Sequence, residues 1–170
     1  MVVSSEIFVG RANELAAMTA ELDHARAGRP RVLRLSGPAG IGKTTLIRRL
    51  LADRADVRVL WSSGDEAETG LPYGVVGQLL AELPRRPPSP DADPLAVGAE
   101  LLAVLGELEP VVLVLDDVQA LTGETARIPL QLARHMPEGV HLILASRQRP
   151  DSSISRLRLG GVCEIDAPAL

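Results

Sequence analysis

The 170-residue sequence contains very few aromatic residues and a single cysteine. Phe8, Trp61 and Tyr73 are its only aromatic side chains, so a core must be built from Leu, Val, Ile and Ala. Such a core suits helices packed on a parallel sheet. Cys163 has no second cysteine to pair with, which excludes an internal disulfide and favours a reducing, cytoplasmic environment.

Long apolar segments and an excess of positive charge are also missing. The longest strongly apolar run, Val111 to Leu115, is far too short to span a bilayer. Residues 1–6 lack the basic and apolar segments of a signal peptide. The net charge of −4 argues against a general nucleic-acid-binding surface. We therefore expect a cytoplasmic chain that binds neither membranes nor nucleic acids directly.

Lysine is almost absent as well. Of the 18 basic residues 17 are arginine, and the one lysine is Lys43, inside a glycine-rich segment. A compact ammonium group fits among phosphate oxygens where a broad guanidinium group would not. A single lysine can stand in such a segment by chance, so a phosphate-binding role for Lys43 depends on the surrounding motif.

Apolar periodicity predicts strands and helices that alternate along one domain spanning residues 1–170. Strands are expected at 31–36, 57–62, 111–115, 140–146 and 161–165, and helices at 12–27, 43–52, 73–83, 95–108 and 124–135. This order predicts an α/β fold with a doubly wound, mainly parallel sheet of five strands. Residues 84–94 hold five prolines and are expected to form an exposed connector within that domain.

The segment from Gly37 to Thr44 matches G-x-x-x-x-G-K-[ST] and lies between a predicted strand and a predicted helix. Its glycines let backbone N–H groups surround phosphate oxygens, and the following helix adds the positive end of its dipole. We expect Lys43 to reach the β- and γ-phosphates of ATP and Thr44 to bind Mg²⁺. An incidental glycine turn is the alternative. The predicted nucleotide-binding residues of this loop are Gly37, Pro38, Ala39, Gly40, Ile41, Gly42, Lys43, Thr44 and Thr45.

Two carboxylates follow the apolar strand at 111–115. Asp116 and Asp117 would lie at the carboxyl edge of the sheet, where ligands bind in open α/β folds. We predict that Asp116 completes the Mg²⁺ site with Thr44, and that Asp117 positions or activates the attacking water. The alternative is a structural turn in which these residues cap the next helix.

Arg147 directly follows the predicted strand at 140–146. A cation at this strand end would contact the γ-phosphate, so Lys43, Asp117 and Arg147 form the predicted catalytic set. Arg149 competes for this role. The alternative for Arg147 is an ordinary surface arginine paired with a neighbouring acid.

Several segments resemble one family. Residues 8–11 (FVGR), followed by Glu14 and Leu15, resemble the opening box of signal-transduction ATPases with numerous domains. Within that class, the segments GPAGIGKTTL, GLPYGVV, VLVLDDVQ and LILASR resemble large ATP-binding transcriptional regulators of the LuxR type. The resemblance covers nearly the whole chain.

The resemblance implies a three-layer α/β/α P-loop fold in which the strand at 140–146 separates the phosphate-loop strand from the acidic strand. It places Gly10 and Arg11 near the adenine and ribose, with Val9 beside the base. It also implies a nucleotide switch, in which ATP permits assembly and hydrolysis or ADP restores the resting state.

The sequence departs from the family pattern in two places. Gln119, Ala120 and Thr122 stand where the family often has His-Trp-x-Asp, and the chain ends at Leu170. We therefore expect no helical lid, weak nucleotide binding and slow turnover. Expected partners are ATP and ADP, a second copy of the chain, or effector and DNA-binding domains that such regulators carry further along.

Three functions remain open at this point. The preferred one is a slowly hydrolysing MgATP switch of a transcriptional regulator. The others are a non-hydrolysing interaction module, and a small-molecule phosphotransferase in which Arg85 and Arg86 would belong to a lid. A guanine-selective Asn-Lys-x-Asp motif is impossible when Lys43 is the one lysine, which favours adenine by exclusion.

Overall fold

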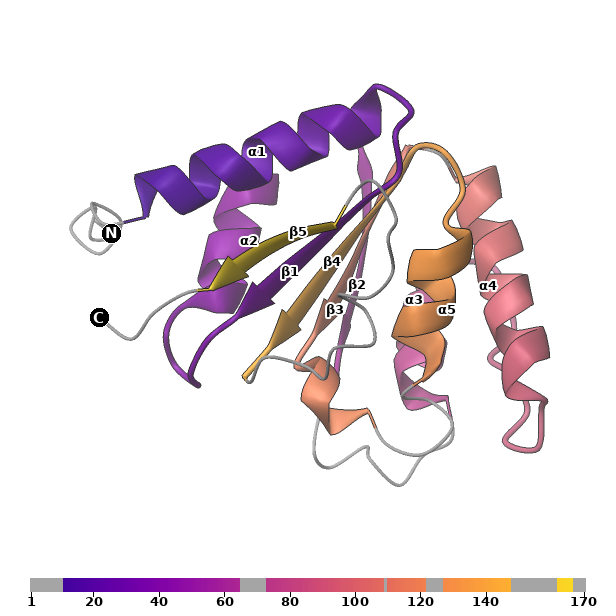
Figure 1. Ribbon diagram of the computed structural model, residues 1–170. Helices are drawn as coiled ribbons and strands as arrows, with labels where there is room; N and C mark the ends of the chain where they lie inside the picture. Colours follow the sequence, from indigo (N-terminus) through magenta and orange to yellow (C-terminus); the bar gives the residue numbers. More distant parts are fainter. Residues whose placement is uncertain (1–10, 65–72, 109, 122–126, 148–161, 167–170) are drawn as a thin grey trace.

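The computed structural model describes residues 11–64, 73–108, 110–121, 127–147 and 162–166 of the 170-residue chain (Figure 1). These residues alternate between strands and helices, as the periodicity predicts. In chain order the elements are α1 (Ala12–Arg26), β1 (Arg31–Ser36), α2 (Lys43–Leu51), β2 (Arg58–Ser63), α3 (Gly74–Ala81), α4 (Pro94–Glu107), β3 (Val111–Asp116), the short 3-10 helix η3 (Val118–Ala120), α5 (Ile128–His135), β4 (Val140–Ser146) and β5 (Val162–Asp166).

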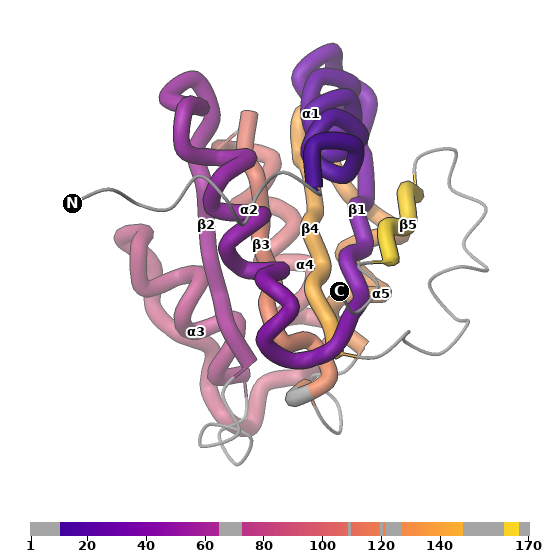
Figure 2. The backbone as a smooth tube through the Cα atoms, turned by 90° about the vertical axis from the view of Figure 1, so that its left-hand side faces the viewer, coloured from indigo at the N-terminus to yellow at the C-terminus, as the bar shows by residue number. Residues whose placement is uncertain are grey.

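The five strands form one parallel sheet in the order β2-β3-β4-β1-β5 (Figure 2). β4 therefore lies between β1 and β3, which confirms the strand placement that the family resemblance implies. Leu33 of β1 pairs with Ile143 of β4, and Leu113 of β3 pairs with Leu142. Because every strand runs the same way, the carboxyl ends of β1, β3 and β4 meet at one edge of the sheet.

Helices cover both faces of the sheet, giving three layers. α1 and α2 pack on one face, and α3, α4 and α5 pack on the other (Figure 1). Alternate residues of one strand serve the two cores, as Leu33 and Leu35 face α1 and α2 while Val32 faces the opposite layer. β3 and β4 are buried along their whole length, which explains their continuous apolar sequence.

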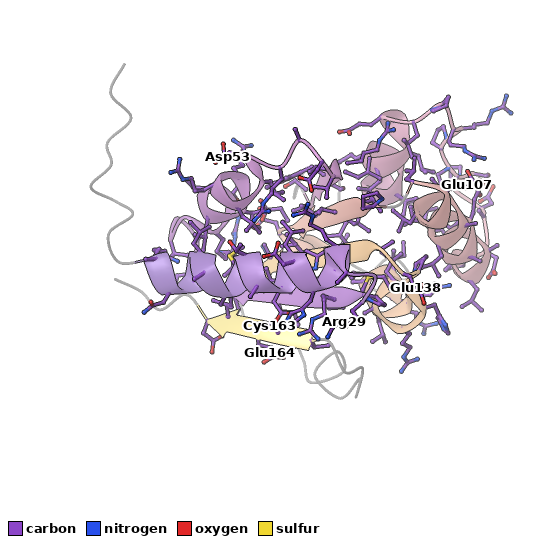
Figure 3. The ribbon with its side chains drawn as sticks, turned by 90° about the horizontal axis from the view of Figure 1, so that it is seen from above. Arg29, Asp53, Glu107, Glu138, Cys163 and Glu164 are labelled. Atoms are coloured by element: carbon purple, nitrogen blue, oxygen red, sulfur yellow. The ribbon has the colours of Figure 1, made fainter. Side chains whose placement is uncertain are left out.

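β5 forms one edge of the described sheet beside β1. In the view from above, β5 lies beside α1 (Figure 3), and Cys163 of β5 packs against the core on the α1 side of the sheet. Buried Arg34 of β1 donates a 2.5 Å hydrogen bond to Glu164, which ties this edge strand to its neighbour. Within the described part of the chain, no helix is both long and apolar enough to cross a membrane.

The expected elements are all found, with small shifts at their ends. β1 and β4 have the expected bounds, whereas β2 lies one residue later than expected. The prediction that the proline-rich connector includes Pro94 was wrong, because Pro94 begins α4. Asp93 caps that helix by accepting a 3.1 Å hydrogen bond from the N–H of Ala96, and proline is tolerated in a first helical turn. Of the helix expected at 124–135, residues 124–126 lie outside the described part, and α5 begins at Ile128.

Candidate phosphate-binding site

The glycine-rich loop connects β1 to α2 at the carboxyl edge of the sheet. Its first residue is fixed to β4, because the N–H of Gly37 donates a 3.2 Å hydrogen bond to the carbonyl of Ser146. Gly40 and Gly42 have φ angles of 76° and 91°, which side-chain-bearing residues rarely adopt. Gly42 is also the N-cap of α2, so the N–H groups of the first turn and the positive end of the helix dipole face the loop.

Lys43 begins α2 and is 7% exposed. Its Nζ donates hydrogen bonds of 2.7 Å to the carbonyl of Gly37 and 2.9 Å to that of Pro38. Burial lowers the pKa of Lys43 from its usual 10.5, and the nearby carboxylates of Asp117 and Asp116 oppose this shift. The ammonium group is therefore held against the loop by two neutral carbonyl oxygens.

Thr44 and Asp116 meet between the first turn of α2 and the end of β3. The hydroxyl of Thr44 donates a 2.6 Å hydrogen bond to Oδ2 of Asp116. Oδ1 of Asp116 accepts a 3.0 Å hydrogen bond from the N–H of Asp117, so both carboxylate oxygens are bonded. The backbone of Asp116 is held as well, since its carbonyl accepts from the N–H of Gly64 at 2.9 Å. The two residues predicted to bind Mg²⁺ are thus side by side.

Asp117 leaves the strand in a left-handed backbone conformation, with φ 54° and ψ 46°. Asp and Asn tolerate this conformation better than most residues. Its Oδ1 accepts a 3.0 Å hydrogen bond from Nε2 of Gln119 and lies 3.7 Å from Nε of Arg147. The N–H of Arg147 in turn donates to Oε1 of Gln119 at 3.1 Å. Sequence reasoning did not select Gln119 as a site residue, and its only signal was the departure from the family pattern.

These groups surround one cavity of about 310 Å³, near the lower end of the range for small-molecule sites. Two cations and two carboxylates line it, so its fixed charges nearly balance. Three residues of the loop do not line the cavity that the described residues define, namely Gly37, Pro38 and Ile41. The lining residues are Ala39, Gly40, Gly42, Lys43, Thr44, Thr45, Asp116, Asp117 and Arg147.

Arg11 occupies a different position from these residues. It precedes α1 and is 7% exposed, and its guanidinium donates a 2.7 Å hydrogen bond to the carbonyl of Ile41 in the loop. Its other terminal nitrogen, NH1, has no hydrogen-bond partner among the described residues. Contact of Arg11 with a ribose stays a prediction, and Val9, Gly10 and Arg149 lie outside the described residues.

The donor set fits a magnesium-bound phosphate chain. Mg²⁺ takes oxygen ligands and is usually held by one or two protein groups together with substrate phosphates. The Thr44 hydroxyl and the Asp116 carboxylate provide such oxygens, 2.6 Å apart and directly beside the loop. The N–H groups of the loop and the ammonium of Lys43 are suited to the phosphate oxygens.

Comparison with known proteins gives relatives among transcriptional regulators. The chain is 33% identical over 142 residues to the HTH-type transcriptional regulator MalT of Yersinia enterocolitica, covering 76% of this chain and 16% of that protein. It is 31% identical over 136 residues to MalT of Serratia proteamaculans, covering 72% and 15% respectively. The chain thus spans about a sixth of the length of these relatives, and the similarity confirms the resemblance to large transcriptional regulators.

The fold and the family are supported by two further comparisons. The crystal structure of Cdc6p from Pyrobaculum aerophilum superimposes with a TM-score of 0.65 at 19% identity, covering 96% of this chain and 49% of that one. This confirms the expected α/β fold. Residues 7–145 match the model of the AAA ATPase domain. The chain therefore belongs to the AAA ATPase domain family.

Proposed function

We propose that this chain binds MgATP between the phosphate loop and β3, hydrolyses it slowly, and acts as the nucleotide switch of a transcriptional regulator. The observation that carries the proposal is the 2.6 Å hydrogen bond between Thr44 and Asp116 beside the ammonium group of Lys43. It brings a hydroxyl, a carboxylate and a cation to one cavity at the end of a phosphate-binding loop. These are the groups that phosphoryl transfer from a nucleotide requires.

Binding of the phosphates follows from the loop and the first turn of α2. Backbone N–H groups would donate to the phosphate oxygens, and Lys43 would exchange its bonds to the carbonyls of Gly37 and Pro38 for bonds to charged oxygens. Hydrogen bonds between two charged groups are stronger than those to a neutral carbonyl, which favours this exchange. Mg²⁺, held by Thr44 and Asp116, would neutralise part of the phosphate charge.

Hydrolysis would use Asp117 and Arg147. The oxygen of a water molecule attacks the γ-phosphorus, and the bond from that phosphorus to the β–γ bridging oxygen breaks. The electron pair of that bond leaves with ADP, and the carboxylate of Asp117 accepts the proton of the water. Arg147 would offer positive charge to the γ-phosphate oxygens from the end of β4. Its 3.7 Å separation from Asp117 supports a joint role.

The switch role rests on similarity to the MalT proteins, which are named HTH-type transcriptional regulators. The match covers about a sixth of those proteins, so effector and DNA-binding parts would lie beyond the region of similarity. We infer that ATP and ADP states of this domain, in the cytoplasm, would control either self-association or contact with such parts. Direct DNA binding by this chain is disfavoured by its net charge of −4.

Two alternatives differ from this proposal at particular residues. In a non-hydrolysing interaction module Asp117 would do no chemistry, and phosphate release would be absent. A small-molecule phosphotransferase would need arginines over the cavity. Arg85 donates a 2.6 Å hydrogen bond to Glu107, and the cavity defined by the described residues is lined by neither Arg85 nor Arg86.

The test is calorimetric titration with MgATP, together with phosphate release from the same samples. Wild type is compared with Lys43→Ala and with the control Arg29→Ala, which removes the same charge from an exposed residue before β1. We expect wild type and the control to bind and to release phosphate slowly. Lys43→Ala is expected to lose binding. Absence of binding by wild type at millimolar MgATP would refute the proposed function, and binding without phosphate release would favour the non-hydrolysing module.

A further inference from the structure

Gln119 of η3 connects two parts of the candidate site with one side-chain amide. Its Nε2 donates a 3.0 Å hydrogen bond to Oδ1 of Asp117, and its Oε1 accepts a 3.1 Å hydrogen bond from the N–H of Arg147. Arg147 is 28 residues further along the chain and directly follows β4. The amide therefore joins the residue after β3 to the residue after β4.

The chemistry of this bridge requires both halves of an amide. A carboxylate only accepts hydrogen bonds and a backbone N–H only donates, so the linking side chain must donate at one end and accept at the other. Glutamate in this place would keep the acceptor for Arg147 but would turn a negative oxygen towards Asp117. Leucine would keep a similar volume and lose both bonds.

Gln119 is exposed and does not line the cavity that the described residues define. Its bonds to Asp117 and Arg147, which do line the cavity, are therefore its connection to the site. In this structure Oδ1 of Asp117 is shared between the amide of Gln119 and, at 3.7 Å, the guanidinium of Arg147. A γ-phosphate that attracts Arg147 would leave Gln119 as the donor that holds the carboxylate.

We propose that Gln119 is a positioning residue for ATP hydrolysis, which fixes the carboxylate of Asp117 relative to the end of β4. The inference rests on the proposed function, because it needs hydrolysis to have an effect. Small displacements of a reacting group cost up to about 100-fold in rate, although they leave binding of the substrate largely intact. Loss of Gln119 should accordingly lower kcat and leave KM nearly unchanged.

The experiment compares the full chain with Gln119→Leu, Gln119→Glu and Gln119→His, and with the matched control Gln131→Leu. Gln131 lies on α5, its Nε2 donates a 3.3 Å hydrogen bond to the carbonyl of Leu95, and it does not line the cavity that the described residues define. We expect Gln119→Leu and Gln119→Glu to lower kcat about 10- to 100-fold. Gln119→His, whose two ring nitrogens can donate and accept, should retain most of the rate, and the control should match wild type.

Two further measurements separate positioning from a general loss of structure. In a double-mutant cycle, Gln119→Leu should add little to the defect of Asp117→Asn, because Gln119 acts through the carboxylate that Asp117→Asn has already removed. Amide hydrogen exchange measured by NMR should be faster for the N–H of Arg147 in Gln119→Leu and unchanged in Gln131→Leu. This second readout needs no hydrolysis.

The outcomes distinguish this inference from the proposed function. Phosphate release by wild type that is unaffected in Gln119→Leu overturns the inference and leaves the proposed function standing. Full additivity with Asp117→Asn also overturns it. Wild type that binds MgATP without releasing phosphate overturns the inference together with the hydrolytic part of the proposed function, whereas wild type that fails to bind overturns both completely.

Discussion

The hydroxyl of Thr44 and the carboxylate of Asp116 are hydrogen bonded at 2.6 Å although 72 residues separate them in the chain. This contact joins the first turn of α2, which follows β1, to the end of β3, and β4 lies between those two strands in the sheet. Asp116 is 5% exposed, and its second oxygen is bonded to the N–H of Asp117. Two hydrogen bonds from the protein itself therefore orient the carboxylate towards Thr44.

Removing the hydroxyl of Thr44 should weaken nucleotide binding mainly in the presence of Mg²⁺. Thr44→Ala leaves the loop N–H groups and Lys43 in place, so binding of ATP in EDTA should change little. Binding of MgATP should weaken and approach the value in EDTA. The same variant should lose about 1–3 kcal/mol of unfolding free energy, because Asp116 loses a partner where water has little access. Calorimetry and urea unfolding measure the two effects.

Two controls make the Thr44 prediction specific. Thr44→Ser keeps the hydroxyl and should keep the dependence on Mg²⁺. Thr19→Ala removes a threonine hydroxyl that donates 2.8 Å to the carbonyl of Leu15 in α1, and it should leave nucleotide binding unchanged. Equal weakening of ATP binding with and without Mg²⁺ in Thr44→Ala would contradict a metal-binding role for this residue.

The affinity for ATP should begin to fall at a lower pH than it would if Lys43 had the usual pKa of a lysine. Burial lowers the pKa of Lys43 from 10.5, and phosphate binds only the protonated ammonium group well. At a pH below this lowered pKa, Lys43 is already charged and has no effect on the pH dependence. Above it, binding must take up a proton, so the affinity decreases as pH rises. Titrations in two buffers of different ionisation enthalpy measure both the affinity and the proton uptake.

Lys43→Arg is the control for this pH dependence. Arginine stays protonated throughout the range, so the variant should bind more weakly near neutral pH but lose the alkaline decrease. The two proteins differ at this one position, so the difference between their titrations isolates the contribution of Lys43. An unchanged alkaline decrease in Lys43→Arg would assign it to another group.

The phosphate loop and the sheet were predictable because local signals agree with the tertiary structure. β1 has the segment VLRL at its centre and is bounded by Pro30 and Gly37, and the motif itself requires a strand before it and a helix after it. The place of Asp116 was predictable for a related reason, since the apolar run of β3 ends in this carboxylate at the carboxyl edge of the sheet. In these places one short segment contains the whole signal.

Other parts depend on distant contacts that no short segment contains. The bridge made by Gln119 depends on the backbone N–H of Arg147, and the buried position of Arg11 depends on its hydrogen bond to the carbonyl of Ile41, 30 residues away. Both arise from packing of whole elements, so periodicity and motif spacing do not reveal them. Pro94 is a different case. Asp93 directly before it is a residue typical of a helix N-cap, but the prolines that precede both residues favoured a connector.

His141 gives the structure an internal source of acid sensitivity. It lies in β4 between Arg31 of β1 and Val112 of β3, is 1% exposed, and its ring nitrogens have no hydrogen-bond partner among the described residues. Burial lowers the pKa of His141 from 6.5 to about 4; the backbone of Arg31 opposes this shift, and the charge of Arg31 adds to it. The folded chain therefore keeps this imidazole neutral at a pH where the unfolded chain protonates it.

Protonation in the unfolded chain makes stability decrease as pH falls. The contribution of neutral His141 to the free energy of unfolding is fully present above pH 6.5 and is lost as the pH falls from 6.5 to about 4. By about pH 4 the loss is about 3 kcal/mol. His141→Val should remove this part of the decrease, because valine has no group that takes up a proton. Urea unfolding at pH 7 and pH 4.5 measures the difference for wild type, for His141→Val and for the exposed control His135→Val. His135→Val controls for the general effect of removing a histidine. If His141→Val loses as much stability as wild type between pH 7 and pH 4.5, the acid sensitivity comes from carboxylates instead.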